Sequence, residues 1–385
     1  MPTVLISPVF KKPIATYFPA LTGLRACAAY LVFLFHYNPF QSNTWLNRFF
    51  NEGHIGVTLF FVLSGLLICL RYIDRVELSG QWLSKYFRNR IARIYPMYFL
   101  VTLLTFFLTW LQPGRDISGH WLKSSLFEKV LTVFLNITLL RGFFQDFIAT
   151  GVLPGWTLTV EETFYFLAPL LLVGLVRVNS LNKYVLLLLY ALAILAVGFT
   201  LVRIAPHKFG FFISNGYMLN VTFFGRCFEF ISGMALAIFM RNSSSEPRTG
   251  ISWATWLGLA WIGAAMYVAM LGLAGETPTD QGAGITSFGR NILNNFFVPP
   301  GIVLLYWGLI YEKTWLRWLL SSKLFDLLGK SSYVFYLIHM GVFSMAIGRY
   351  VSHNQLVIFV LLVLASIMMH KFIEEPMHKL IARRK

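Results

Sequence analysis

Hydrophobic residues occur along this chain in long runs that are separated by short polar segments. A helix needs about 20 mainly apolar residues to cross a membrane. Ten runs approach that length, at residues 21–38, 54–70, 91–111, 157–176, 184–202, 218–240, 252–274, 291–311, 328–348 and 354–370. An eleventh stretch, at 130–140, is short and fits a re-entrant or interfacial helix as well as a span. The pattern predicts an all-α, polytopic membrane bundle of about ten helices, or eleven if 130–140 crosses.

The positions of the basic residues separate these two topologies, because cytoplasmic segments of membrane proteins are enriched in Lys and Arg. With ten spans, the segments on one side hold 21 of the 32 Lys and Arg residues and those on the other side hold nine. An eleventh crossing removes this bias. We therefore expect ten spans with both termini cytoplasmic, and a first span that is not cleaved. The expected organisation is a cytoplasmic segment at 1–20, a membrane domain at 21–376 and a basic tail at 377–385.

Composition excludes the soluble classes. Hydrophobic residues make up 57% of the 385 residues and charged residues only 12%, about half the usual charged fraction of a soluble protein. The net charge of +16 is mostly a topology signal, and without a basic stripe or a nucleic-acid module we expect no nucleic-acid partner. One cluster stands out, with four cations within residues 85–93. Membrane anchoring and an anionic ligand explain that cluster equally well. The three cysteines have no metal or disulfide spacing, so no metal site is expected.

Ionisable residues inside spans are costly, and each is a candidate functional residue. Arg25 and His36 are eleven residues apart in the first span, which places them on one stripe of a helix about 16 Å apart along its axis. A fixed cation and a titratable imidazole suit a reaction that uses both sides of a membrane. A snorkelling Arg with a hydrogen-bonded His is the structural alternative.

The other intramembrane charges have equally plain structural interpretations. Glu161 and Glu162 point about 100° apart, so we expect one to face the bundle and the other to cap the start of its helix. Arg226 and Glu229, at i and i+3, can form an ion pair. His339 lies among aromatic residues and fits a satisfied buried imidazole. Residues 56 and 64–65 are small and favour close helix packing.

Soluble-type catalytic motifs are missing from the sequence, which has no Gly-x-Ser-x-Gly elbow, P-loop or His-Glu-x-x-His element. Isolated carboxylates and cations in a membrane also suit a proton-coupled carrier. The residues alone leave a carrier and a membrane-embedded transferase balanced.

Seven segments, in order, give the chain a family resemblance. They are Leu21-Thr-Gly-Leu-Arg25-Ala with His36, Gly56-Val-Thr-Leu-Phe-Phe-Val-Leu-Ser64-Gly65, Arg90-Ile-Ala-Arg93-Ile-Tyr-Pro96, Trp156-Thr-Leu-Thr-Val-Glu161-Glu162-Thr-Phe-Tyr165, Gly225-Arg226-Cys-Phe-Glu229-Phe, Leu328-Gly-Lys-Ser-Ser-Tyr333-Val-Phe-Tyr336-Leu-Ile-His339, and Glu375-Pro376. With these segments the chain resembles the acyltransferase-3 family of integral membrane acyltransferases. Thr58 departs from the family, which often has Asp there. Because the chain stops shortly after Pro376, we expect a stand-alone acyltransferase without the C-terminal hydrolase-like domain of some members.

The resemblance implies transfer of an acyl group, usually acetyl, from cytoplasmic acyl-CoA to a hydroxyl of a carbohydrate or lipid-linked glycan. It implies that His36, Arg25 and Glu161 are catalytic. It implies that the donor CoA is bound by Arg90 and Arg93, with Lys85 and Arg88 adding to the local positive potential. The expected substrate-binding residues are Trp156, Glu162, Ser64, Arg226, Glu229, Tyr333 and His339.

Acyl-CoA is expected as a donor substrate, with no tightly bound cofactor, and the expected location is a bacterial inner membrane. His36 either deprotonates the acceptor hydroxyl or carries the acyl group itself, and Glu161 holds the imidazole tautomer or bonds the acceptor. Two alternatives stay open: a proton-coupled carrier, and an acyltransferase whose acceptor is a macrolide, peptide or lipid.

Overall fold

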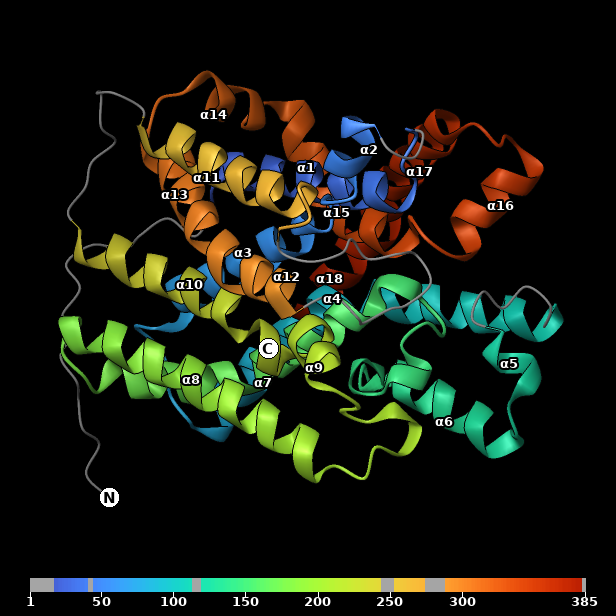
Figure 1. Cartoon of the computed structure of the whole chain (residues 1–385), viewed down its shortest axis with the longest axis horizontal. Coiled ribbons are helices and arrows are strands. Elements are labelled where there is room, and N and C mark those ends of the chain that lie inside the picture. Colours follow the sequence, from blue (N-terminus) through green and yellow to red (C-terminus); the bar gives the residue numbers. More distant parts are fainter. Residues whose placement is uncertain (1–16, 41–43, 113–118, 244–252, 274–287, 383–385) are drawn as a thin grey trace.

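The computed structural model describes residues 17–40, 44–112, 119–243, 253–273 and 288–382 (Figure 1). In these ranges the chain is helical and has no strand, and Phe144 and Phe211 form an isolated β-bridge. Eighteen α-helices are present there: α1 (Pro19–His36), α2 (Trp45–Phe50), α3 (Ile55–Tyr72), α4 (Gly80–Leu111), α5 (His120–Lys123), α6 (Leu126–Ile137), α7 (Trp156–Val176), α8 (Ser180–Ile204), α9 (Asn215–Val221), α10 (Phe223–Asn242), α11 (Trp253–Met270), α12 (Phe288–Ile292), α13 (Val298–Tyr311), α14 (Trp315–Leu320), α15 (Lys323–Ile338), α16 (Val342–Tyr350), α17 (Gln355–Met369) and α18 (Glu375–Ala382).

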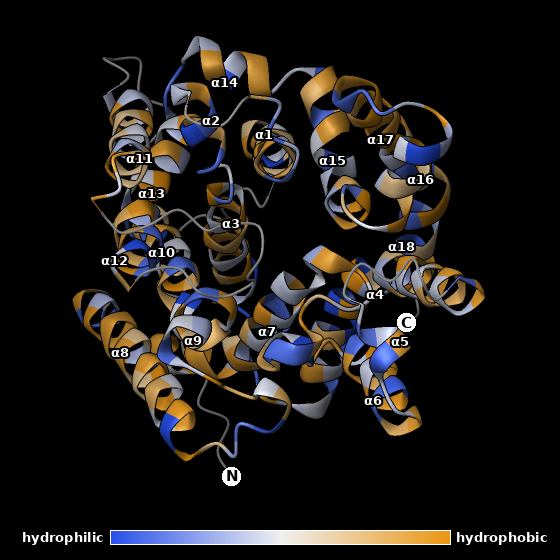
Figure 2. Cartoon of the chain, turned by 45° about the vertical axis from the view of Figure 1, so that its right-hand side comes forward, coloured by the Kyte–Doolittle hydropathy of each residue, from blue (hydrophilic) through white to orange (hydrophobic). Residues whose placement is uncertain are grey.

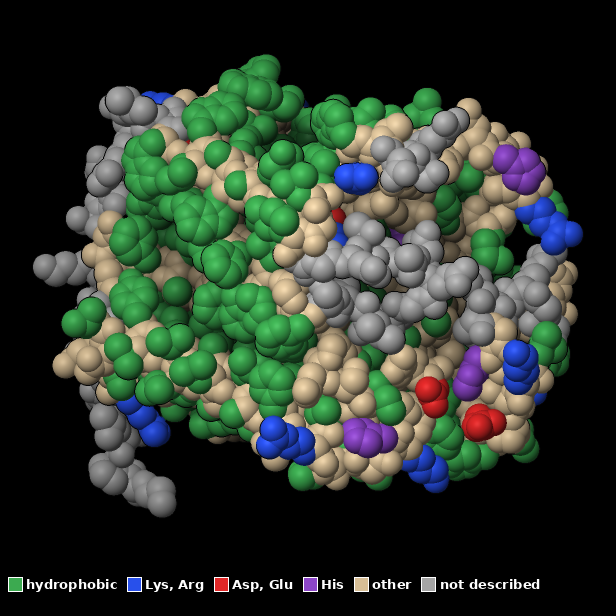
Figure 3. All heavy atoms as spheres, viewed as in Figure 1, with side chains coloured by type: hydrophobic (Ala, Val, Ile, Leu, Met, Phe, Trp, Pro, Cys, Tyr) green, Lys and Arg blue, Asp and Glu red, His purple; other side chains and the backbone are tan. Residues whose placement is uncertain are grey.

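The predicted membrane bundle is confirmed. Within the described ranges, nine helical segments are long and apolar enough to cross a membrane, or ten if one bent pair counts as a span. The nine are Pro19–His36, Trp45–Tyr72, Gly80–Leu111, Leu153–Val176, Leu181–Ile204, Asn215–Asn242, Trp253–Met270, Phe288–Tyr311 and Gln355–Ala382. Helix α8 illustrates the apolar outer surface that such a bundle needs. Its Leu181, Leu188 and Leu192 are exposed on the surface of the bundle, as side chains that face lipid would be. Hydrophobic side chains also dominate the face in Figure 3, where charged ones lie mainly toward the edges.

The run at 328–348 differs from its prediction, because it is not one continuous helix. Its residues belong to α15 and α16, whose axes are bent by 84°. The bend follows His339 and includes Gly341, whose φ of +90° lies in a region that favours glycine. Hydropathy alone does not reveal such a turn, because the residues on both sides of it are equally apolar.

Residues 130–137 of the short apolar stretch at 130–140 belong to α6, a 12-residue helix. Such a helix is about 18 Å long, well short of the roughly 30 Å hydrocarbon core of a bilayer. Its start is fixed by a capping box in which Ser125 and Glu128 bond each other's backbone amides. The stretch is therefore too short to add an eleventh span.

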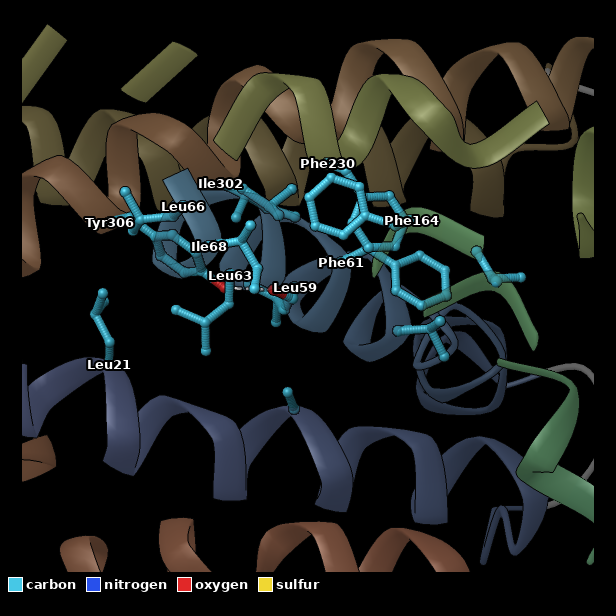
Figure 4. Packing of buried hydrophobic residues seen from close by; sticks show 14 of the residues in the cluster. Leu21, Leu59, Phe61, Leu63, Leu66, Ile68, Phe164, Phe230, Ile302 and Tyr306 are labelled. Carbon is cyan, nitrogen blue, oxygen red and sulfur yellow. Dashed lines mark hydrogen bonds between the residues drawn. The ribbon is translucent and has the colours of Figure 1, made fainter. Parts of the chain in front are cut away.

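Helix α3 lies at the centre of the bundle, in contact with α1, α7, α10 and α13 (Figure 2). It approaches α10 closely at Gly65, where a Cβ would lie 1.9 Å from the carbonyl oxygen of Phe230. Figure 4 shows the rings of Phe61, Phe164 and Phe230 packed together beside this contact. The hydroxyl of Tyr306 donates to the Leu59 carbonyl at 2.6 Å. The predicted close packing at 64–65 is confirmed.

Both ends of the described chain lie at the same end of the bundle. The Tyr17 hydroxyl bonds the carboxylate of Asp326, and the ammonium of Lys330 lies 5.9 Å from the centre of the Tyr17 ring. Lys330 also interacts electrostatically with Glu375 at the start of α18. Residues 377–382 continue α18, whereas 1–16 and 383–385, which complete the predicted terminal segments, lie outside the described residues.

Candidate active site

A cavity of about 660 Å³, counted to its open mouth, lies between α1, α3, α4, α7 and α15. We call it the inner cavity. Its walls are formed by Arg25, Val57, Phe60, Phe61, Leu63, Ser64, Leu67, Arg93, Ile94, Thr157, Leu158, Glu161, Tyr333 and Tyr336. Five of the predicted site residues, Arg25, Ser64, Arg93, Glu161 and Tyr333, therefore meet at one place although they come from five helices.

Glu161 is held in the wall of the inner cavity by two hydroxyl groups. The Ser64 hydroxyl donates to its Oε1 atom, and the Tyr165 hydroxyl donates to the same oxygen at 2.6 Å. Tyr165 lies one helical turn beyond Glu161 on α7, and Ser64 reaches it from α3. Two donors on one oxygen leave Oε2 free to accept a proton or a hydrogen bond.

Glu162 points to a different part of the bundle, as the helix geometry predicts. Its Oε1 atom is buried and has no hydrogen-bond partner within the described residues, and its charge interacts with Arg90. Neither glutamate caps the helix, because α7 begins at Trp156, five residues before Glu161. The predicted capping role is wrong for that reason. Trp156 is half-buried and packs into the hydrophobic core, outside the residues that line the inner cavity.

Arg25 faces the inner cavity from α1. Its side chain is half-buried, and within the part of the chain that the structure describes it makes no hydrogen bond or ion pair. Glu161 and Glu374 interact with it electrostatically, but at longer range. A guanidinium that lines a cavity with its donors free can bind an anionic or carbonyl group that enters the cavity.

His36 lies about three turns further along α1 and does not line the inner cavity. Its ring centre is 5.5 Å from that of His339, at the end of α15. His339 is fully buried, and its Nδ1 atom lies 2.7 Å from the carbonyl oxygen of Tyr336. Because a carbonyl only accepts, Nδ1 carries the proton and the Nε2 lone pair remains. Nε2 is buried without a partner within the described residues, so His339 is only half satisfied.

A second hollow, of about 950 Å³ to its open mouth, lies beside the first. We call it the basic cleft. Its walls are formed by Arg71, Tyr72, Arg75, Trp82, Lys85, Tyr86, Asn89, Arg90, Arg93 and His378. Half of these residues are Lys or Arg, and none is acidic. Arg93 lines both hollows, so the basic cleft and the inner cavity meet at its side chain.

The predicted donor-binding residues are placed in three different ways. Lys85 and Arg93 are exposed in the basic cleft. Arg90 is buried, with its guanidinium 5.7 Å from the ring centre of Tyr72 and 5.5 Å from that of Tyr165, so it also supports the wall. Arg88 is half-buried and is not among the residues that line the basic cleft.

Sequence reasoning missed two cations of the basic cleft, Arg71 and Arg75. They follow the apolar part of α3, and the turn before α4 brings them opposite Lys85 and Arg93. The clustering of six cations within 71–93 is a signal for this group, but it does not say which of them share a cleft.

Arg226 and Glu229 form the ion pair that their spacing predicts, with Nη2 and Oε1 2.8 Å apart and both side chains buried. The Thr58 hydroxyl lies between them, 3.2 Å from Arg226 Nη2 and 3.3 Å from Glu229 Oε1. Neither charged residue lines the inner cavity, although the guanidinium lies 5.2 Å from the ring centre of Phe61, which does. The pair is a buried structural unit behind the cavity wall, in which Glu229 Oε2 has no hydrogen-bond partner within the described residues.

Comparison with known proteins decides the family. Residues 18–369 match the family described as an acyltransferase domain. The chain belongs to the acyltransferase-3 family. The match covers every helix that lines the inner cavity, and no solved structure matches the chain.

Three relatives illustrate the family. A Staphylococcus aureus protein named "Putative O-acetyltransferase" is 23% identical over 94% of this chain. The chain spans only 58% of the length of that relative. A Listeria monocytogenes protein named peptidoglycan O-acetyltransferase OatA is 27% identical over 60% of this chain and 36% of its own length. A Streptomyces mycarofaciens protein named acyltransferase MdmB is 24% identical over 95% of this chain and 93% of its own length.

Proposed function

We propose that this chain transfers an acyl group, in the simplest case acetyl, from acyl-CoA to a hydroxyl of an envelope carbohydrate or lipid-linked glycan. The observation that supports this most is the meeting of the basic cleft and the inner cavity at Arg93. A donor with a polyanionic nucleotide and a long neutral arm matches such a pair of hollows, because the cations attract the phosphates and the apolar walls accept the arm. The family membership supports the same reaction class.

In the proposed complex the phosphates lie in the basic cleft, and the pantetheine arm passes Arg93 into the inner cavity. The excess of Lys and Arg on one side of the predicted topology supports placing the basic cleft in the cytoplasm, where acyl-CoA is made. Arg25, with its donors free, orients the arm. About 16 Å of helix separates Arg25 from His36, so the two residues act at successive points along the path of the donor.

His36 performs the proton transfer in this proposal. The imidazole takes the proton of the acceptor hydroxyl, the oxygen attacks the thioester carbonyl, and the carbon–sulfur bond breaks. The thiolate of CoA then receives the proton from the imidazolium. Alternatively the imidazole nitrogen attacks the thioester first and CoA leaves as the thiolate. The acceptor hydroxyl then takes the acyl group from the imidazole, and its proton goes to the thiolate. Glu161 bonds the acceptor or the arm rather than the His36 ring, because its two donors hold it at the cavity near Arg25.

The name of the Listeria relative favours a glycan hydroxyl as acceptor, whereas MdmB is named only as an acyltransferase. Macrolide, peptide and lipid hydroxyls are therefore tested beside cell-wall glycans. The rival activity is a carrier that binds a solute at Arg25, His36 and Glu161 without covalent chemistry.

One assay separates these activities. The purified chain is incubated with acetyl-CoA and an acceptor, and free thiol is followed over time. An acyltransferase releases thiol only when the acceptor is present, and His36→Ala abolishes this release because it removes the imidazole that takes the acceptor proton or carries the acyl group. Release by His36→Ala at the wild-type rate would contradict the role of His36. A wild-type chain that releases no thiol with any acceptor extract would favour the carrier.

The donor site is tested separately. Arg93→Gln should raise the KM for acetyl-CoA about tenfold while the KM for the acceptor stays the same, because one charge-assisted phosphate contact is lost. Arg177, exposed just beyond α7 and outside the basic cleft, provides the matched control Arg177→Gln. If Arg93→Gln changes only the KM for the acceptor, Arg93 binds the acceptor and its assignment to the donor is wrong.

A further inference from the structure

The first three turns of α4 present two parallel rows of side chains to the basic cleft. One row is Trp82, Tyr86 and Arg90, and the other is Lys85, Asn89 and Arg93. Each row has i, i+4, i+8 spacing, which places its members one above the other on a helix. The rows descend from the rim of the cleft at Trp82 to the junction with the inner cavity at Arg93, about 16 Å along the helix axis.

Trp82 and Tyr86, the two aromatic residues of the first row, form a flat wall at the rim of the basic cleft. Trp82 and Tyr86 are stacked, with ring centres 5.3 Å apart and planes inclined by 10°. The Tyr72 ring meets both edge-on, and Tyr86 is buried with its hydroxyl donating to the Tyr165 carbonyl at 3.0 Å. Tyr86 thus supports one face of the Trp82 indole. The other face has no ring partner within the described residues, and Trp82 is half-buried in the wall of the cleft.

The cations at the rim are unusually free. Arg75 and Lys85, like Arg93 deeper in the cleft, are exposed and make no ion pair or side-chain hydrogen bond in the ranges that the structure describes. Arg71, near the end of α3, lines the same cleft as Arg75, Lys85 and Trp82. The acidic residue nearest in sequence, Asp74, is engaged by Arg241.

We propose that the rim of the basic cleft is a nucleotide subsite, in which Trp82 stacks on an adenine ring and Arg71, Arg75 and Lys85 bind a ribose 3′-phosphate. This inference rests on the proposed function, whose donor carries both groups. The row from Lys85 to Arg93 then follows the diphosphate toward the inner cavity. The subsite makes the chain selective for CoA over donors that lack the 3′-phosphate.

Anionic lipid headgroups are the other source of phosphate at a membrane surface, and they would also be attracted to these cations. A lipid headgroup has no aromatic base, so it gives no reason for a supported indole face beside the charges. The combination of a stacking surface and clustered cations is the one that nucleotides use. The aromatic wall therefore favours the nucleotide.

Binding measurements test the subsite without requiring catalysis. The purified chain, in nanodiscs of phosphatidylcholine, is titrated calorimetrically with CoA, dephospho-CoA and adenosine 3′,5′-bisphosphate. We expect CoA to bind about tenfold more tightly than dephospho-CoA, because the latter loses a charge-assisted contact. We expect the bisphosphate, which has no pantetheine arm, to bind and to compete with CoA. Equal affinities for CoA and dephospho-CoA would overturn the assignment of the 3′-phosphate.

Two variants with matched controls locate the subsite. Trp82→Leu should weaken CoA and bisphosphate binding about tenfold, the usual scale for loss of base stacking. Its control is Trp318→Leu, at an exposed tryptophan of α14. Arg75→Gln should reduce the preference for CoA over dephospho-CoA, and Arg177→Gln should not. Unchanged binding in Trp82→Leu would overturn the stacking role.

Failure of this inference can be told from failure of the proposed function. A chain that releases thiol from acetyl-CoA but does not distinguish CoA from dephospho-CoA keeps the function and loses the subsite. A chain that binds the bisphosphate through Trp82 but releases no thiol keeps the subsite and loses the function. Arg75→Gln is also compared with the wild type for its affinity for phosphatidylglycerol. If the substitution weakens phosphatidylglycerol binding and leaves nucleotide binding unchanged, the cations bind lipid and the proposed subsite is wrong.

Discussion

Two of the arginine–glutamate sets inside this bundle are arranged in opposite ways. Arg226 and Glu229 on α10 are buried against each other, with Thr58 completing the unit from α3. Arg25 and Glu161 face a shared cavity from different helices, and Arg25 makes no hydrogen bond or ion pair within the described residues. Both sets belong to segments that resemble the family. Only the second set lines a cavity that a ligand can enter.

The difference shows how an ionisable residue in a membrane is used. A buried ion pair offsets the desolvation of its charges with its own contacts, so its loss is felt in folding. A charge beside an open cavity has no ion-pair partner within the protein. Its loss therefore lowers the affinity for a ligand more than it lowers the stability of the fold. The predictions below test this division, from the largest expected effect to the smallest.

Replacing Glu229 by Ala should destabilise the protein by about 3–5 kcal/mol, because Arg226 is left buried without its partner. Thermal unfolding of the detergent-solubilised chain measures this effect. Glu161→Gln serves as the comparison and should unfold near the wild-type temperature. If both variants lose stability equally, the two sets do not differ in the way described.

Tyr165→Phe should lower the kcat/KM of acyl transfer about tenfold, because Glu161 loses one of its two donors while the ring beneath Arg90 remains. Thiol release per folded molecule measures it. Tyr98→Phe is the control, since that hydroxyl bonds the Asn136 carbonyl away from the inner cavity. Wild-type turnover in Tyr165→Phe would show that Glu161 needs no such support.

Thr58→Val should cost about 1 kcal/mol of stability, because it removes the hydroxyl between Arg226 and Glu229. Thr58→Ser keeps the hydroxyl and should recover most of the loss in the same unfolding measurement. A loss of transfer without a loss of stability would move Thr58 from the structural set to the catalytic one.

The smallest effect is expected at Arg88. Arg88→Gln should change the KM for acetyl-CoA by less than about twofold, because Arg88 lies in the basic run but not in the wall of the basic cleft. Steady-state kinetics beside Arg93→Gln provide the comparison. A shift in Arg88→Gln as large as that in Arg93→Gln would mean that overall charge, and not the cleft, attracts the donor.

Much of the fold was predictable, because hydropathy in a membrane is set by each segment on its own. The run at 21–38 corresponds to α1 within two residues. Helix α4 begins eleven residues before the predicted run at 91, because Ser79 caps a charged first part that hydropathy does not count. The bend after His339 escaped prediction, because it depends on one backbone conformation at Gly341.

The site was predictable in its residues but not in their grouping. The cost of burying charge singled out Arg25, Glu161, Arg226 and Glu229 equally. Which of them face a cavity depends on how separate helices pack, as the contact of Ser64 with Glu161 across α3 and α7 shows. Arg25 and His36 share a helix, yet only Arg25 lines the inner cavity, because α15 covers the face where His36 meets His339.

The central claim is that the inner cavity receives the donor at Arg25, whereas the Arg226–Glu229 pair supports the bundle behind its wall. It is tested most directly by measuring thiol release from acetyl-CoA, per folded molecule, in Arg25→Gln and Arg226→Gln. We predict that Arg25→Gln stays folded and loses about 10- to 100-fold in kcat/KM, whereas Arg226→Gln loses folded protein while the molecules that remain folded are active. Wild-type turnover by folded Arg25→Gln would contradict the account.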